Sequence, residues 1–250
     1  MRNLYTLTKR EFGSYWWSPI AYVVIAVFLV IQGYTFWLLM NSLNSAHGTV
    51  TTDAVMEFFF GDIFFWFCLL LITPLITMRL ISDEIKSGTF ELLMTAPVTD
   101  SEVVLSKFFG AYIFYLVLWI PTLSFAGILK YYINPGFGPI WASYLGTALL
   151  GAVLISIGTF TSALTKNQII AAILSFFIIL AFFSIGFLNS FISDQTSRDI
   201  ISYISILDHY MDFSRGIVDT RHIIYYLSFT SIMLFFTVKA IESRKWRYRS

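Results

Sequence analysis

Long apolar runs, separated by short segments that hold most of the charged residues, dominate this chain of 250 residues. A helix needs about 20 apolar residues to cross a hydrocarbon core of about 30 Å, and six runs are long enough. They are Ile20–Met40, Phe58–Met78, Val103–Leu129, Ile140–Leu164, Ile169–Phe191 and Ile223–Ile241. The pattern predicts an all-α, polytopic membrane protein with six transmembrane helices, which form one domain over residues 20–241.

A few residues within the spans depart from the apolar pattern. Pro74 and Pro121 lie in spans two and three, where neighbouring helices can satisfy the carbonyl that a proline leaves unpaired. Gln32 lies deep in span one, and we expect its amide to hydrogen-bond to a neighbouring residue. Span four carries small residues at every fourth position from Ala148 to Ser156, a spacing that allows close helix packing within one chain or between two.

Lysine and arginine are unevenly distributed over the two sides of the predicted membrane domain. If the N-terminus is cytoplasmic, twelve of the sixteen fall on the cytoplasmic side, including those of the basic tail 242–250. Only Lys130, Arg198, Arg215 and Arg221 remain outside. Because basic residues accumulate in cytoplasmic loops, we expect a multi-pass protein of the inner (plasma) membrane, held in the lipid bilayer with both termini in the cytoplasm.

Composition narrows the classes of protein further. Only 12% of the residues are charged and the net charge is +1, whereas a soluble domain carries roughly 25% charged residues. This balance gives no indication of a nucleic-acid partner. The single cysteine, Cys68, lies in an apolar run, so a disulfide framework within the chain and a cysteine-based metal site are excluded.

The spans also lack the groups that many membrane enzymes and carriers use. Their middles hold no ionisable residue, whereas ion-coupled carriers usually place Asp, Glu, His or Arg at depth. The three histidines, His47, His209 and His222, lie outside the spans and cannot ligate haem or a metal within them. No G-x-x-x-x-G-K-[ST] motif is present. We therefore expect no enzymatic activity and no cofactor on this chain, and energy for any driven transport must come from a partner.

The loop between spans two and three, residues 79–102, carries the most local structure. Gly88 separates a charged extension of span two from a short helix, Thr89–Ala96. Thr99 and Glu102 then form a capping-box pattern at the start of the next helix. A short helix between two spans could pass motion from a soluble partner to the membrane, and an ordinary solvated loop is the alternative.

Two further segments flank the spans. Residues 1–19 place aromatic and apolar side chains on one face of a helix and basic ones on the other, which predicts an amphipathic helix in the inner interface. A plain interfacial anchor is equally compatible with that pattern. Residues 189–222 mix apolar and charged positions, which predicts an outer helical hairpin that dips partly into the outer leaflet. The alternative for this segment is a small soluble cap.

These elements and their order resemble the type-two ABC exporter permease family over essentially the whole chain. The family's E…GT.E.L…P…E….K pattern is matched in order and spacing by Glu84, Gly88, Thr89, Glu91, Leu92, Leu93, Pro97, Glu102 and Lys107. The start of the chain resembles the gliding-motility and copper-site-maturation branch, with Lys9, Arg10, Glu11 and the stretch Ser18–Tyr22. The stretch before the last span resembles the same branch, with Asp208, His209, Phe213, Ser214, Arg215, Gly216 and Asp219.

The resemblance implies a type-two ABC exporter permease fold and a specific division of labour. The segment around Gly88 and Thr89 would be the coupling helix that docks on a separate ABC ATPase, which binds ATP and Mg²⁺. The expected ATPase-coupling interface consists of Arg10, Glu11, Glu84, Gly88, Thr89 and Glu91. The expected outer hairpin site consists of Asp208, His209, Arg215 and Gly216.

We expect the working complex to hold two permease subunits, identical or related, and two ATPase chains. An outer domain, if the complex has one, would be an extracytoplasmic accessory protein on another chain. A secondary carrier or channel, and a membrane scaffold or assembly protein, are the alternatives from other classes. The transported substrate cannot be derived from the sequence.

Overall fold

The computed structural model describes residues 2–45, 52–89, 98–133, 137–188 and 194–249. Within these ranges all regular structure is helical. In chain order the helices are α1 (Arg2–Trp16), α2 (Pro19–Ser45), α3 (Thr52–Gly61), α4 (Ile63–Thr77), α5 (Ser82–Ser87), α7 (Asp100–Trp119), α8 (Leu123–Ile133), α9 (Phe137–Leu164), α10 (Gln168–Leu188), α11 (Gln195–Ile204), α12 (Ile206–Ser214) and α13 (Thr220–Arg249). Among the residues that the structure describes, six helical stretches are long and apolar enough to cross a membrane. The predicted all-α class and the six spans are confirmed.

Two of the spans are interrupted, although the sequence predicts them as continuous. Span two divides at Asp62, which caps α4 by accepting a hydrogen bond from the Phe64 N–H at 3.4 Å. Span three divides at Pro121, between the end of α7 and the start of α8. Proline has no N–H to continue the helical ladder. Pro74, by contrast, lies inside α4 without ending it.

The core is centred on α9, which packs against α4, α7, α10, α12 and α13. Glycines let its neighbours approach closely, because a Cβ at Gly151 would overlap the Tyr115 ring and one at Gly158 would overlap Thr77. The small residues Ala152 and Ser156 are buried within the chain, so the packing at these two positions is within one subunit. Fewer residues are buried in the spans of α2, α10 and α13 than in the other spans.

Gln32 departs from the sequence expectation. Its side chain is fully buried, yet neither amide atom has a hydrogen-bond partner among the described residues. The expected bond to a neighbouring residue is therefore not formed within the described part of the chain.

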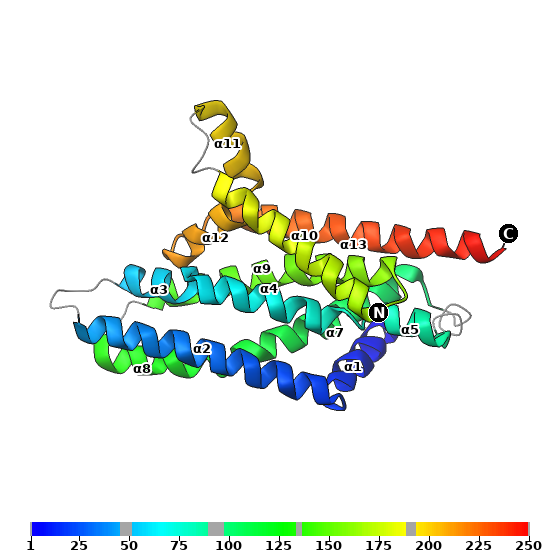
Figure 1. Ribbon diagram of the computed structural model, residues 1–250, viewed down its shortest axis with the longest axis horizontal. Coiled ribbons are helices and arrows are strands. Elements are labelled where there is room, and N and C mark those ends of the chain that lie inside the picture. The colour runs from blue at the N-terminus through cyan, green and yellow to red at the C-terminus, as the bar shows by residue number, and fades with distance from the viewer. Residues whose placement is uncertain (1, 46–51, 90–97, 134–136, 189–193, 250) are drawn as a thin grey trace.

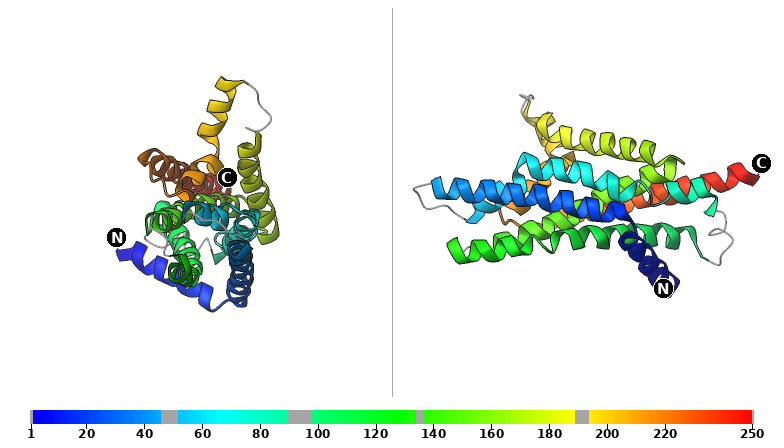
Figure 2. Two further views of the ribbon diagram at one scale, coloured as in Figure 1. Left: turned by 90° about the vertical axis from the view of Figure 1, so that its left-hand side faces the viewer. Right: turned by 60° about the horizontal axis from the view of Figure 1, so that its bottom comes forward.

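The segments with predicted functional roles lie at the two ends of the bundle. Helix α1 leaves the bundle at an angle at the end where α5 and the C-terminus of α13 also lie, whereas α3, α11 and α12 lie toward the opposite end (Figures 1 and 2). We call these the α1–α5 end and the α3–α12 end. Two short helices, α11 and α12, lie within the segment 189–222 of the predicted outer hairpin, of which residues 189–193 lie outside the described residues.

Candidate functional site

The corner between α4 and α5 is fixed by a single hydroxyl of α9. Ser162 Oγ accepts hydrogen bonds from the N–H groups of Ile81 and Ser82, at 3.0 and 3.1 Å, and donates to the Met78 carbonyl at 3.3 Å. These groups belong to the end of one helix and the start of the next, where backbone groups lack partners within the helix. The corner therefore sets the direction in which α5 presents Glu84.

Helix α5 ends at Gly88, whose φ of 73° lies in the left-handed region. The next residue, Thr89, exchanges a hydrogen bond with Ser87 through their side-chain oxygens at 2.8 Å. Residues 90–97, and with them Glu91 and most of the predicted short helix, lie outside the described residues. The chain is described again before α7, where Thr99 and Glu102 form the predicted capping box with bonds of 3.1 and 3.2 Å.

Helix α1 packs its second half onto α7. Tyr15 stacks on Phe114 with ring centroids 4.6 Å apart, and its hydroxyl donates to the Ile76 carbonyl at 3.0 Å. Burial raises the pKa of the Tyr15 hydroxyl, and the charge of Glu11 raises it further, so the hydroxyl stays a donor. Tyr5 belongs to the same predicted apolar face but is 72% exposed. At Tyr15, therefore, the predicted apolar face packs against protein rather than lipid, whereas at Tyr5 it is exposed.

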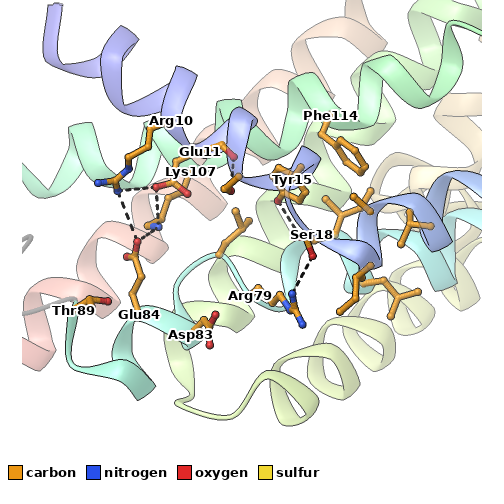
Figure 3. A pocket seen from close by; sticks show the side chains of 17 residues that line it. Arg10, Glu11, Tyr15, Ser18, Arg79, Asp83, Glu84, Thr89, Lys107 and Phe114 are labelled. Carbon is orange, nitrogen blue, oxygen red and sulfur yellow. Dashed lines mark hydrogen bonds and ion pairs between the residues drawn. The ribbon is translucent and has the colours of Figure 1, made fainter.

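Four charged side chains from α1, α5 and α7 meet beside this crossing, and we call them the ion-pair cluster: Arg10, Glu11, Glu84 and Lys107 (Figure 3). Lys107 Nζ lies 2.7 Å from Glu84 Oε1 and 3.4 Å from Glu11 Oε1. Arg10 lies 3.0 Å from Glu11 Oε1 and 4.0 Å from Glu84 Oε1. The cluster has two positive and two negative charges, so its net charge is zero.

Lys107 is the most enclosed member of the cluster, with only 1% of its surface exposed. An ammonium in such a place is stable only when it is paired, because desolvation of an isolated charge costs several kcal/mol. Its two carboxylates come from different helices, α1 and α5. Lys107 therefore holds α1 and α5 to α7 at the α1–α5 end.

A cavity of about 530 Å³ opens beside the cluster, between α1, α2, α4, α5 and α7 (Figure 3). Its volume falls within the range of small-molecule sites, about 300–1,000 Å³. The ion-pair cluster borders one side of it. On another side Arg79 donates a hydrogen bond to Ser18 Oγ at 3.2 Å.

A second polar cluster joins α12 to the start of α13 at the α3–α12 end. His209 and His222 approach through their Nδ1 atoms at 2.6 Å. His209 Nε2 lies 3.1 Å from the Tyr203 carbonyl, and His222 Nε2 lies 2.9 Å from Asp212 Oδ2. Because a carbonyl only accepts, His209 must carry its proton on Nε2, and its Nδ1 then accepts from His222.

The rest of the predicted outer site is distributed around this pair. Arg215 donates two hydrogen bonds to Glu57 Oε1, from Nε at 3.1 Å and Nη2 at 2.9 Å, and so ties α12 to α3. Gly216 has a φ of 84° and lies against Pro139 at the start of α9. The N–H of Asp208 donates to Ser205 Oγ at 3.1 Å, which caps α12.

Comparison with known sequences identifies the family. A sequence model described as ABC-2 family transporter protein matches residues 5–240, nearly the whole chain. The chain belongs to the ABC-2 transporter family. A search of curated proteins found no match. Family membership makes this ABC-2 transporter a membrane permease subunit, implies an ABC ATPase as its partner, and agrees with the six apolar helices. The assignment to the gliding-motility and copper-site-maturation branch stays a prediction.

The structure of this ABC-2 transporter brings together three of the residues predicted for ATPase coupling, Arg10, Glu11 and Glu84, in one cluster. Gly88 and Thr89 follow Glu84 by four and five residues, just beyond the end of α5. Lys107 was expected only as a member of the family pattern and not as the centre of the cluster. The available signal was a lysine set two turns into a helix that continues as an apolar span.

The sequence also did not predict the partners of the residues in the expected outer hairpin site. His222 and Asp212 complete the hydrogen-bonded chain around His209, and Glu57 pairs with Arg215. Glu57 is 158 residues from Arg215 in sequence, so no local pattern relates the two.

Proposed function

We propose that this ABC-2 transporter is the permease subunit of an ATP-driven exporter in the inner (plasma) membrane, with both termini in the cytoplasm. Two permeases, identical or related, work with two ATPase chains that carry the ATP and Mg²⁺. The α1–α5 end is the cytoplasmic end in this proposal. The transmembrane domain is 20–241, flanked by the interfacial helix 1–19 and the basic tail 242–250.

The ion-pair cluster is the observation that carries the proposal. It joins α5, which lies within the loop 79–102, to the interfacial helix α1 and to the first half of span three, α7. A rigid connection of this kind is what a permease needs if a soluble motor is to move several helices together. Coupling travels through packed and paired elements that have two arrangements.

In the proposed mechanism, the conformational change starts at the loop 79–102. Closure of the ATPase pair pushes the segment around Gly88, Thr89 and Glu91. Because Glu84 is bound to Lys107, the push on α5 moves α7 and, through Glu11, also α1. The dimer then changes between inward and outward access. Arg10, the most exposed member of the cluster, is the residue best placed to meet the ATPase directly.

The rival classes lack comparable support. A secondary carrier or channel would need ionisable groups or a polar path at depth, and the middles of the spans carry none. A scaffold or assembly protein would not need a buried charge network beside a loop that turns on a left-handed glycine. Family membership favours transport over both.

The test uses the permease purified with its ATPase chain in lipid nanodiscs. A spin label on Thr220→Cys, in a Cys68→Ala background, reports motion at the α3–α12 end when ATP is added. We expect ATP to change the spectrum in the parent protein. Glu84→Gln should leave assembly and ATP hydrolysis in place but remove this change.

Glu242→Gln is the matched control, because Glu242 pairs with Lys239 on the exposed surface of α13 near the same end. This variant should show the same ATP-dependent change of the spectrum as the parent protein. A permease that purifies free of any ATPase, in repeated preparations from its own cells, would contradict the proposed class. An ATP-dependent change that survives Glu84→Gln would contradict the coupling route alone.

A further inference from the structure

The cavity at the α1–α5 end has a charge distribution that the proposed coupling role does not use. Among its cationic residues, Lys107 is bound by Glu84 and Glu11, and Arg10 is bound by Glu11. Arg79 differs, because its one hydrogen bond goes to the neutral Ser18 and it makes no ion pair within the described part of the chain. A guanidinium has five N–H donors, so most of the donors of Arg79 have no partner among the described residues and could bind an anion.

The acidic residue of the cavity nearest to Arg79 in sequence keeps its negative charge but forms no ion pair with Arg79 among the described residues. Asp83 also lines the cavity, but its carboxylate accepts a hydrogen bond from the Gln168 side chain of α10 at 2.5 Å. Ser18, in turn, accepts from Arg79 and keeps its own hydroxyl proton for a further acceptor. Arg79 and Ser18 together therefore present donors to one place on the cavity wall (Figure 3).

The wall next to this polar place is apolar and follows both helices. On α4, Leu75 lines the cavity four residues before Arg79, which follows the end of that helix, so Leu75 lies farther into the span. On α2, Ile20 and Val24 lie two and six residues after Ser18, farther along the span, and also line the cavity. Leu75 is 40% exposed, so this wall is open to the surroundings of the bundle.

The position of the cavity along the spans matches the edge of a bilayer. Trp16 and Trp17 lie at the α1–α2 turn, 38% and 91% exposed, and tryptophan is enriched where a membrane meets water. Helix α2 enters its apolar stretch directly after this turn. The polar place thus lies at headgroup level and the apolar wall at the level of the acyl chains.

We propose that this cavity binds a membrane phospholipid, with its phosphate on Arg79 and Ser18 and the first part of an acyl chain on Leu75, Ile20 and Val24. Arginine and lysine side chains at the surface of a membrane attract anionic headgroups. Binding depends on the membrane setting and not on the ATPase, so it can fail while the proposed transport function holds, and the reverse.

The test is native mass spectrometry of the full permease released from detergent micelles, with lipid added in steps. Phosphatidylglycerol supplies both phosphate and chains, diacylglycerol supplies the chains alone, and inorganic phosphate supplies the anion alone. We expect saturable binding of one phosphatidylglycerol per chain and markedly weaker binding of the other two. Equal retention of diacylglycerol, or full competition by inorganic phosphate at matched concentration, would overturn the proposal.

Substitutions locate the site. Arg79→Gln should weaken phosphatidylglycerol binding by roughly tenfold or more, which corresponds to the loss of one hydrogen bond to a charged group. Arg79→Lys keeps the charge and should recover part of the affinity. Lys86→Gln, on the exposed side of α5 and outside the cavity, is the matched control for loss of one positive charge at this end. If Arg79→Gln and Lys86→Gln bind alike, the phosphate is not on Arg79.

Discussion

Glu11 of α1 packs directly over Gly110 of α7, where an added Cβ would lie 2.7 Å from the Glu11 Cβ. Real Cβ atoms do not approach so closely, so α1 can cross α7 at this depth only because position 110 is a glycine. Gly110 lies three residues beyond Lys107, on the same side of α7. The close crossing therefore also brings the Glu11 carboxylate to Lys107, at 3.4 Å.

Gly110→Val should displace α1 from α7. Overpacking a close contact costs about 1–3 kcal/mol, and α1 is the element that can move, because it lies at the edge of the bundle (Figure 2). Lys9 and Arg10 on α1 should then be cleaved faster by trypsin in the folded protein. Gly127→Val is the control, because a Cβ at Gly127 would meet nothing within 4 Å. Unchanged cleavage in Gly110→Val would mean that α1 tolerates the added bulk.

Lys107→Met should lower the free energy of unfolding more than any other single change in the ion-pair cluster. Removing one partner of a buried pair costs about 3–5 kcal/mol, and the 22% exposure of the Glu84 side chain moves our expectation toward the lower value. The double variant Lys107→Met/Glu84→Gln should lose less free energy of unfolding than the two single variants together, because the effects of substituting two contacting residues do not add. The difference is the coupling energy that this double-mutant cycle measures.

An exposed ion pair provides the comparison for this double-mutant cycle. Lys239 and Glu242 lie 2.7 Å apart on α13 with side chains 54% and 39% exposed. The corresponding pair of changes, Lys239→Met and Glu242→Gln, should cost about 0–1 kcal/mol. Denaturation in mixed micelles measures both cycles. Equal coupling energies in the two pairs would show that burial adds nothing to the Lys107 pair.

Local features of the fold could be predicted because each depends on neighbours in sequence. The capping box of Thr99 and Glu102 is a pattern of four residues, and the six spans need only length and apolar content. Asp62 shows the limit of this reasoning. One polar residue in an apolar run becomes a helix cap that divides span two, and nothing in the hydropathy distinguishes a cap from a tolerated polar residue.

The pairings in the candidate sites could not be predicted, because they join distant parts of the chain. Lys107 and Glu11 are 96 residues apart, and their meeting depends on how α1 crosses α7. His209 and His222 are only 13 residues apart, yet a turn of undetermined shape separates them in the sequence. The charges of the residues alone could not predict which of several acidic side chains pairs with each basic one.

The packing of α12 should weaken as the pH falls. Burial lowers the pKa of His209, and the charges of His222 and Arg221 lower it further, against the opposing effects of the Tyr203 carbonyl and Asp208. The unfolded chain, with a histidine pKa near 6.5, then binds the proton more readily than the folded protein. The contribution of His209 to stability is therefore complete above about pH 6.5 and is lost as the pH falls toward the lower pKa of the folded state.

The geometry also predicts that protonation of His209 destabilises the folded protein, because a proton on His209 Nδ1 would face His222 Nδ1 across 2.6 Å. We expect the melting temperature to fall between pH 7.5 and 5.5, and to fall less in His209→Gln, which cannot take up that proton. His47→Gln controls for the loss of a histidine as such. The prediction fails if His209→Gln shows the same pH dependence as the parent protein.

The proposed topology makes a direct labelling prediction. In a Cys68→Ala background, single cysteines at Asn44 and Thr220 should react with a membrane-impermeant thiol reagent in intact cells, because both positions are exposed at the α3–α12 end. Cysteines at Ser87 and Ser243 should react only after the cells are opened. The reason is the excess of lysine and arginine at the α1–α5 end. Labelling of Ser87 from outside would reverse the orientation.

The left-handed turn at Gly88 allows a test of the coupling loop that separates backbone strain from steric clash. A Cβ at position 88 would meet nothing within 4 Å, so only the φ of 73° disfavours other residues. Asparagine tolerates this conformation, whereas a β-branched residue does not, and the left-handed backbone costs an ordinary residue about 1–2 kcal/mol. Gly88→Val should therefore leave insertion and abundance unchanged but reduce co-purification of the ATPase and ATP-driven motion at Thr220. Gly88→Asn should keep both near the parent level. If the two variants behave alike, whether both active or both inactive, the turn itself does not carry the coupling.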